Sequence, residues 1–470
     1  MSYSFDNFAQ YLIDIVDGAI DATMHLNGYG GNKDDGYSGG DPLVRVAPLG
    51  GRYVGSTFEP GGRVTDPTGQ YESFVHFRPE WPFDDIPSMQ NYYWKRVNEL
   101  FEDWYRIPAP TPPGATPGFD GPIAGARTAA SALAFSADKV ETPGNDLFGG
   151  DPQLGSALQN LDQDLDGMDG YAIRTFKLLY ADPLEDVTAS QEAVACALWI
   201  AVVGEQKVWA KARQGIADIA GQAAAAMKSA DGRGGGDLTV LLDVIGSVAD
   251  VAGLIPGVSE GAKAVSTINS VLKTAYSHVP KSKPEHQPLQ AGDPLGVLSN
   301  VAQAIETLKS QIRGEEDGIR TAMTTDHDTI TDGTEQRSFS LGTPQLLGDT
   351  TASDYRTSND LEMKLSGLKF VATEIMPILS GAYRSAEKGL DDISGSSACW
   401  ARPSGIGIGA TGPFPEVSGL ASTLAGYLAD NARNIDDAAS VLEIVGRDIH
   451  KSDVELHNDL EANRRRLAGR

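Results

Sequence analysis

The chain is poor in cysteine, which limits what covalent cross-links can contribute to its fold. Only Cys196 and Cys399 occur among its 470 residues, far apart and without a CxxC spacing. A framework of several disulfides is therefore excluded, whereas a single bridge between the two stays open. Cys196 stands in the apolar run of residues 194–201 and is expected to be a small, buried hydrophobic residue.

Long apolar runs and a leader-like start are also missing. No uninterrupted apolar stretch reaches the ~18 residues that a membrane-spanning helix needs. Residues 1–20 have no basic segment and contain several Asp residues, so no cleavable signal peptide is visible. We expect a protein that is either cytoplasmic or secreted by a route that uses no cleaved leader.

Positive charge is scarce. The chain has 38 Lys and Arg residues against 64 Asp and Glu residues, which gives a net charge of -26. Because phosphate contacts need a surplus of basic side chains, non-specific binding of nucleic acid is excluded. Such a chain should stay soluble and should favour basic or neutral partners.

Motifs for metal or hydrolytic chemistry are incomplete. Residues 162–167 imitate the start of a calcium loop, but Ile173 stands where the bidentate Glu of such a loop belongs. Residues 257–261 fit the nucleophile-elbow pattern of serine hydrolases. That elbow requires a preceding strand, and Pro256 with the helical spacing upstream argues against one.

The remaining motifs are equally weak. Residues 407–412 fit the glycine pattern of dinucleotide sites, but Pro413 and Pro415 follow, so we expect a flexible loop without a helix start behind it. The Asp-His-Asp sequence at residues 326–328 is expected in a polar connection. We predict no catalytic residue, no metal site and no cofactor. An activity hidden in the N-terminal part stays open, since an active site need not show a linear motif.

Residues 1–107 are rich in aromatic residues and form the first predicted unit. Apolar spacing predicts one helix near residues 6–24 and a second near 91–105. Short strands or loops are expected between them, over residues 28–87. Residues 108–122, rich in proline and glycine, are interpreted as a semi-rigid linker that is neither helix nor central strand.

Beyond the linker, three predicted helices begin with an Asp-Pro pair, at residues 151–152, 182–183 and 293–294. Asp would cap the free N–H groups, and Pro would occupy the first helical position, where its missing N–H is harmless. The spacing predicts a helix up to residue 165, a short helix that stops at Asp182, and then a helix of roughly 45 residues.

The remainder also reads as helix, with two irregular connections. A further long helix is predicted from Pro294 to Met323, followed by a polar, irregular connection over residues 324–358. The last third is predicted as a helix over 361–390, a connection over 394–415 and a final helix over 417–460. The fold class is therefore mainly α: an elongated bundle of long hairpins with an aromatic-rich, partly irregular N-terminal unit.

A turn at Met168, Asp169 and Gly170 separates two helical stretches, and Phe176 follows it. This arrangement resembles the hairpin of WXG100-type substrates of type VII (ESX) secretion, in which a Trp-x-Gly turn joins two antiparallel helices. Met168 replaces the Trp. The resemblance implies one helical hairpin over residues 123–232 and a second, C-terminal hairpin over 359–470.

The same resemblance implies an export signal of the form Tyr-x-x-x-Asp/Glu. Tyr383 with Glu387 fits it on a predicted helix, and Tyr37 with Asp41 also fits. A secretion ATPase would read this signal, and the hairpin would pair with a small WXG100-like helical partner or with itself.

The most apolar part of the chain, residues 238–272, lies within a segment spanning 233–280 and is hinged at Pro256 and Gly257. It resembles the hydrophobic pre-toxin segment that follows such hairpins in polymorphic toxins. A hairpin buried in the bundle and a membrane-inserting element are both open, because small residues permit close helix contacts in lipid. A long helix and polar connection follow over residues 281–358.

These observations lead to one functional hypothesis and two alternatives. We expect a non-enzymatic protein of a type VII pathway, secreted or secretion-associated, that acts through helical protein–protein recognition. The first alternative is a pore-forming helical toxin that makes membrane contact through residues 238–272. The second is a cytoplasmic structural or assembly protein.

Overall fold

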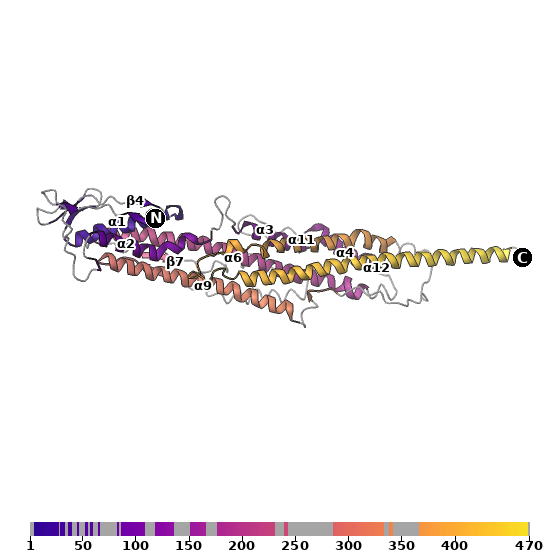
Figure 1. Cartoon of the computed structure of the whole chain (residues 1–470). Coiled ribbons are helices and arrows are strands. Elements are labelled where there is room, and N and C mark those ends of the chain that lie inside the picture. Colours follow the sequence, from indigo (N-terminus) through magenta and orange to yellow (C-terminus); the bar gives the residue numbers. More distant parts are fainter. Residues whose placement is uncertain are drawn as a thin grey trace.

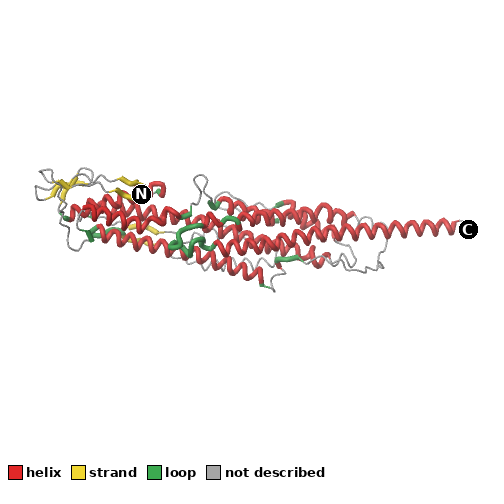
Figure 2. The backbone as a smooth tube through the Cα atoms, in the orientation of Figure 1, coloured by secondary structure: helices red, strands yellow, loops and turns green. Residues whose placement is uncertain are grey.

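The computed structural model describes residues 4–27, six short strands between 29 and 65, and residues 82–83, 86–108, 118–135, 151–165, 176–230, 239–242, 285–332, 338–341 and 366–468. These residues form a mainly α-helical protein, as the sequence predicts. The helices run roughly parallel to one long axis and give an elongated bundle (Figure 1). Among the described residues, the strands lie in the half of the bundle that contains the N-terminus (Figure 2).

The central element is α6, a single helix of 48 residues over Asp182–Ser229. At 1.5 Å per residue it spans about 70 Å. Its C-terminal part packs against α1 (Phe8–Leu26) and α9 (Pro294–Thr331), and its remaining length packs against α3 (Asp120–Leu133) and α12 (Phe414–Ala468). The predicted long helix is therefore confirmed, and it connects both halves of the bundle.

The helices of the N-terminal part share this core. After a short turn, η1 (Phe5–Asn7), helix α1 contacts α2 (Ile86–Phe101), which ends in η2 (Glu102–Arg106). The Thr23 and Tyr93 hydroxyls, 2.7 Å apart, join α1 to α2. In the sequence between α1 and α2, the chain forms an antiparallel sheet in the order β1-β2-β3-β6 and a β4-β5 ribbon, as expected. The strands are β1 (Tyr29–Asn32), β2 (Gly36–Gly39), β3 (Arg45–Val46), β4 (Arg52–Val54), β5 (Thr57–Glu59) and β6 (Val64–Thr65).

The other half of the bundle is built on a close contact between α3 and α11 (Met376–Ser394), with α4 (Pro152–Leu165) beside them. Gly125 and Gly389 face each other there, and a methyl group on either would overlap the backbone carbonyl of the other. The two helices therefore approach more closely than larger residues would allow. α12 packs along the length of α11.

Two predicted irregular segments are partly helical. The linker predicted over residues 108–122 is wrong at its end, because α3 begins at Asp120 and places Pro122 in its first turn, where a missing N–H is tolerated. The irregular connection predicted from residue 324 is wrong up to Thr331, because α9 continues that far. Buried contacts at Ile330 hold these last turns in helical form.

The predicted Asp caps are correct at two sites and wrong at the third. Asp151 accepts the N–H of Gln153 (2.8 Å), and Asp293 accepts the N–H of Gly296 (2.9 Å). Asp182, by contrast, makes no capping bond, because the residues before it are already helical. The short helix therefore continues into α6 instead of stopping at Asp182.

A wider helical turn makes this continuity feasible. In η3 (Lys177–Ala181) the chain forms a π-turn, and the N–H of Asp182 reaches back to the carbonyl of Lys177. The same geometry recurs in η5 (Val371–Ile375), where the N–H of Met376 reaches the carbonyl of Val371. Each π-turn precedes a proline, Pro183 or Pro377, so the helix accommodates a residue without an N–H while its axis continues.

The apolar segment after α6 begins as a strand. β7 (Thr239–Leu242) pairs antiparallel with β8 (Glu285–Pro288), so the helical spacing interpreted from residue 238 is wrong for these first residues. The hinge at Pro256 and Gly257 lies outside the described residues.

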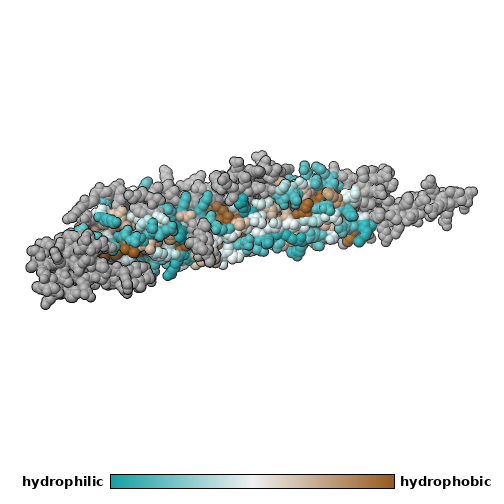
Figure 3. All heavy atoms as spheres, turned by 90° about the horizontal axis from the view of Figure 1, so that it is seen from above, coloured by the Kyte–Doolittle hydropathy of each residue, from teal (hydrophilic) through white to brown (hydrophobic). Residues whose placement is uncertain are grey.

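Most large apolar side chains of the described residues are buried in one continuous core. On the face drawn in Figure 3 hydrophilic residues predominate, and apolar residues appear as separate patches between them. α6 is long and apolar enough to cross a membrane by length and composition, although nearly all of its most apolar window is buried inside the bundle. Cys196 is buried, as predicted, and both cysteines are free thiols.

Candidate functional site

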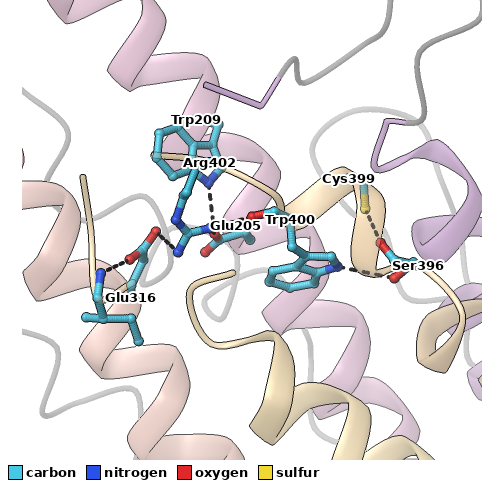
Figure 4. Close-up of polar contacts among 8 residues, drawn as sticks. Glu205, Trp209, Glu316, Ser396, Cys399, Trp400 and Arg402 are labelled. Carbon is cyan, nitrogen blue, oxygen red and sulfur yellow. Dashed lines mark hydrogen bonds and ion pairs between the residues drawn. The ribbon is translucent and has the colours of Figure 1, made fainter. Parts of the chain in front are cut away.

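The most unusual polar feature of the described core is a buried ion cluster between α6, α9 and the segment before α12. Arg402 follows η6 (Ser397–Trp400) and projects into the bundle. Its Nη1 lies 3.0 Å from Oε1 of Glu205 on α6, and its Nη2 pairs with the carboxylate of Glu316 on α9 (Figure 4). All three side chains are fully inaccessible to solvent. We call these three residues the Arg402 centre.

Two tryptophans complete the surroundings of the guanidinium. Trp209 lies one turn after Glu205 on α6 and donates its Nε1–H to Oε1 of Glu205 (2.8 Å). The same indole ring lies 4.9 Å from Cζ of Arg402, within cation–π range. The backbone carbonyl of Trp400 accepts a hydrogen bond from Nη1 (3.2 Å). The charge of Arg402 is therefore matched on several sides within a dry environment.

A glycine-rich loop closes the centre. Gly407 and Gly412 adopt positive φ angles of 72° and 54°, which favour glycine. A Cβ at Gly407 would overlap the Glu316 carboxylate, and one at Gly412 would overlap the Arg402 guanidinium. Between them, the N–H of Ile408 donates to Oε2 of Glu316 (2.7 Å). The spacing that imitates a dinucleotide site thus serves close packing around an internal ion pair.

Two expectations for this loop are corrected. It was expected to be flexible, yet it holds defined hydrogen bonds to Glu316 and from Arg402 N–H to Ala410 (2.9 Å). It was also expected to lack a following helix, yet α12 begins at Phe414, because Pro413 and Pro415 fall at the helix start, where proline is tolerated. The space beside Gly407 and Gly412 is filled by the side chains of Glu316 and Arg402, so nothing in the loop supports a dinucleotide site.

Burial and the positive charge of Arg402 act in opposite directions on the pKa values of the two carboxyl groups of the centre. Burial raises the pKa of Glu316 well above its usual range, and the negative charge of Glu205 raises it further. Burial also raises the pKa of Glu205, while Arg402 and the Trp209 hydrogen bond oppose that rise. Both carboxyl groups therefore have raised pKa values because of burial, and the guanidinium of Arg402 lowers both of them.

The geometry of the centre suits positioning rather than catalysis. A substrate has no access to side chains that are fully enclosed. A buried ion pair must be matched on all sides, so it tolerates one arrangement of α6, α9 and the residue 401–413 loop and penalises others. Among the described residues, no group of three or more His, Cys, Asp or Glu side chains is placed to hold a metal ion.

Two hollows lie on the surface of the described residues. A groove of about 690 Å³ lies between α3, the start of α4 and α11, and its polar lining includes Arg127, Asp151 and Ser385. A smaller hollow of about 490 Å³ is lined by Arg106, Ser404 and Arg402, although the Arg402 side chain itself is inaccessible to solvent. Both hollows are open to solvent.

Of the predicted site residues, the structure describes Tyr383 and Glu387, which lie on α11 and take no part in the Arg402 centre. Tyr383 is buried in α11, and its hydroxyl lies 2.8 Å from that of Thr188, while Glu387 is half-buried. In the folded bundle this Tyr is a core residue, so it is not presented as a surface signal. The turn at Met168, Asp169 and Gly170 lies outside the described residues.

The sequence analysis predicted no member of the Arg402 centre. Glu205 and Glu316 fall on the apolar stripes of α6 and α9, a signal that a polar side chain faces the core. Arg402 carries no such signal, because it lies in the connection before α12 and its partners come from distant parts of the chain. Comparison with known proteins adds no further assignment: no family model, no curated protein and no solved structure matches the chain.

Proposed function

We propose that this chain is a non-enzymatic, secretion-associated protein of a type VII pathway that acts by helical protein–protein recognition. Three features support the proposal. The described residues form long, parallel helices, their most elaborate polar site is sealed from solvent, and the turn sequence at Met168–Gly170 resembles that of WXG100-type hairpins.

The observation that carries the recognition proposal is the length of α12. This helix covers 55 residues, and its C-terminal part runs beyond the other helices (Figure 1). Its described buried positions follow helical spacing from Val417 to Leu442. The sequence continues that spacing with Val445, Ile449, Leu456 and Leu460. Because a lone helix is marginally stable in water, this arm would gain stability from pairing with another helix.

The occupant proposed for this arm is a small helical partner or the arm of a second copy. Substitution of Ile449→Asp together with Leu456→Asp would place charges on the apolar stripe. The matched control, Lys451→Asp with Asn458→Asp, places two acidic residues on the opposite side of the helix by sequence spacing. We expect the first variant alone to lose co-purifying partner or self-association by analytical ultracentrifugation. Equal behaviour of the two variants would contradict the role of the arm.

The secretion part of the proposal is tested in the protein's own host. We expect its abundance in the culture filtrate to fall when the type VII ATPase is deleted. Unchanged abundance, or complete retention in the cells, would contradict this part and favour a cytoplasmic assembly role. The α12 variants, measured in the same filtrates, separate recognition by the arm from export itself.

A second candidate is membrane insertion, favoured by the apolar composition of α6. Because this helix is buried, insertion would require the bundle to open. Release of a fluorescent dye from anionic vesicles would reveal it, and the absence of release between pH 4 and 8 from protein with intact helical circular dichroism would contradict it.

A further inference from the structure

A short segment of the chain is bound between helices in the manner of a peptide ligand. Residues 338–341, with the sequence Ser-Phe-Ser-Leu, contact both α6 and α12. The side chains of Phe339 and Leu341 are 1% and 3% exposed, whereas Ser338 and Ser340 are half-buried. Ser338 and Phe339 lie at the end of a helical turn, and Ser340 and Leu341 follow without regular structure. Alternate residues of the segment are thus buried between the two helices. We call residues 338–341 the strap and its seat the α6–α12 groove.

Asn431 on α12 holds the backbone of the strap with both ends of its side-chain amide. Its Oδ1 accepts the N–H of Leu341 (2.9 Å), and its Nδ2 donates to the carbonyl of Phe339 (3.1 Å). The amide therefore spans one residue of the strap and satisfies a donor and an acceptor on it. These hydrogen bonds contact only backbone atoms of the strap, so they do not select the side chain of the residue between them, Ser340.

Two further amides contact the same backbone. Gln191 on α6 donates its Nε2–H to the carbonyl of Phe339 (2.7 Å), and Asn434 on α12 donates to the carbonyl of Leu341 (3.2 Å). Gln191 and Asn431 are completely buried, and Oε1 of Gln191 has no hydrogen-bond partner among the described residues. The same amide that binds the strap through its Nε2 therefore has an unused acceptor in its Oε1.

The choice of residues indicates a seat for a peptide rather than ordinary helix packing. Gln191 and Asn431 stand on the apolar stripes of α6 and α12, where Leu or Val would pack without polar demands. Buried amides are stable only while hydrogen-bonded, so without a peptide backbone both would be left unpaired. Apolar contacts at two alternate positions then select the side chains.

We propose that the α6–α12 groove is a recognition site for a short aromatic-x-aliphatic segment of a partner protein, occupied in this structure by the chain's own strap. The partner segment would replace Phe339 and Leu341 and take over the amide contacts of Asn431 and Gln191. This inference is independent of the α12 arm and of secretion. Because the strap is tethered, it competes at a high effective concentration, and a free peptide should bind the intact protein weakly.

The direct test uses a fluorescently labelled peptide, Arg-Ser-Phe-Ser-Leu-Gly, copied from residues 337–342. The recipient is the full chain with Phe339→Ser and Leu341→Ser, which empties the groove. We expect saturable binding at least 10-fold tighter than to the unchanged protein, and a loss of at least 10-fold when Asn431→Leu is added. A peptide with Ser in place of Phe and Leu is the control. No binding by a folded, emptied variant, or equal binding of both peptides, would overturn the proposal.

A second measurement covers the case in which the emptied variant does not fold. A polarity-sensitive fluorophore is attached through Ser340→Cys, at a half-buried site, while the two natural cysteines are buried. Excess peptide should shift the emission toward that of a solvent-exposed dye, and the control peptide should not. No shift at saturating peptide would overturn displacement. A shift that depends on protein concentration alone, with dimers in sedimentation, would assign the groove to a second copy and overturn the assignment to a different partner.

Discussion

The hydroxyls of Thr188 and Tyr383 lie 2.8 Å apart although the two residues are 195 positions apart in the chain. The Thr188 hydroxyl also donates a hydrogen bond to the carbonyl of Leu184, one turn earlier in α6 (2.7 Å). Both side chains are fully buried. The pair therefore links α6 to α11 by a polar contact inside an apolar interface, and burial raises the pKa of the Tyr383 phenol, which stays neutral.

Tyr383→Phe should lower the free energy of unfolding by about 1 kcal/mol, because it removes one buried hydrogen bond and preserves the ring. Thr188→Val is the matched change on the other side, and the double variant should be less destabilised than the sum of the two. Chemical denaturation followed by circular dichroism measures all three. Additive losses would show that the two hydroxyls do not interact.

Tyr383→Phe also tests whether Tyr383 acts as a core residue or as part of an export signal. A signal residue would change the amount of protein in the culture filtrate without changing stability, whereas a core residue changes stability first. We expect Tyr383→Phe to leave secretion unchanged once the amount of folded protein is equal. Selective loss from the filtrate at unchanged stability would restore the signal interpretation of Tyr383 and Glu387.

Replacing Arg402 should be among the most damaging single changes in the described core. Arg402→Met leaves Glu205 and Glu316 buried without their cation and should cost about 3–5 kcal/mol. Adding Glu205→Gln and Glu316→Gln to this variant should recover part of the loss, since no buried charge then lacks a partner. Thermal denaturation of the single and triple variants compares them. A loss of stability well below this value in Arg402→Met would show that the centre contributes little to holding α6 and α9 together.

The helices could be predicted because their signals are local and repeated. The stripes of α6, α9 and α12 follow from apolar spacing alone, and even the buried Gln191, Glu205 and Asn431 stand visibly on these stripes. What such residues bind could not be predicted. Glu205 meets an Arg 197 positions away, and Asn431 meets a strap 90 positions away, and no local pattern encodes that proximity.

The prediction of helix boundaries was wrong where the same local sequence fits two structures, a new helix start or a continuous helix with a π-turn. Asp182 and Pro183 fit a helix start, but Phe176 and Tyr180 are buried and hold the preceding turn in helical form. The proline then sits behind a π-turn instead of at a new N-terminus. Tertiary packing decided between the two, and spacing along the chain contains no record of it.

Stability should fall as the pH rises from about 4 to about 8. Burial raises the pKa of Asp326 to about 7 and that of Glu192 to about 8. Between the ordinary carboxyl pKa and these values, the folded state holds protons that the unfolded state has released. Unfolding is therefore favoured as the pH rises through this interval, by on the order of 4–5 kcal/mol per group, and the loss levels off above it.

The variants Asp326→Asn and Glu192→Gln, singly and together, should flatten this dependence because they mimic the protonated groups. Midpoints of urea denaturation at pH 4, 5, 6, 7 and 8 provide the measurement. The Arg402 centre contributes in the same direction, so a residual slope is expected in the double variant. A wild-type protein whose stability rises over this interval would contradict the burial of these carboxyls.

The glycine contact between α3 and α11 gives the sharpest steric prediction. Gly125→Ala would place a methyl group against the carbonyl of Gly389 and against Asp392, so the helices must separate and lose packing along their length. Overpacking of this kind typically costs about 1–3 kcal/mol. Gly381→Ala is the matched control, because Gly381 also lies in α11 but a Cβ there would meet open space. It should instead stabilise by roughly 0.5–1 kcal/mol, because alanine favours a helix over glycine. Opposite signs in thermal denaturation are therefore expected from the same chemical change, and equal stabilisation by both would show that α3 and α11 are not held in this close contact in solution.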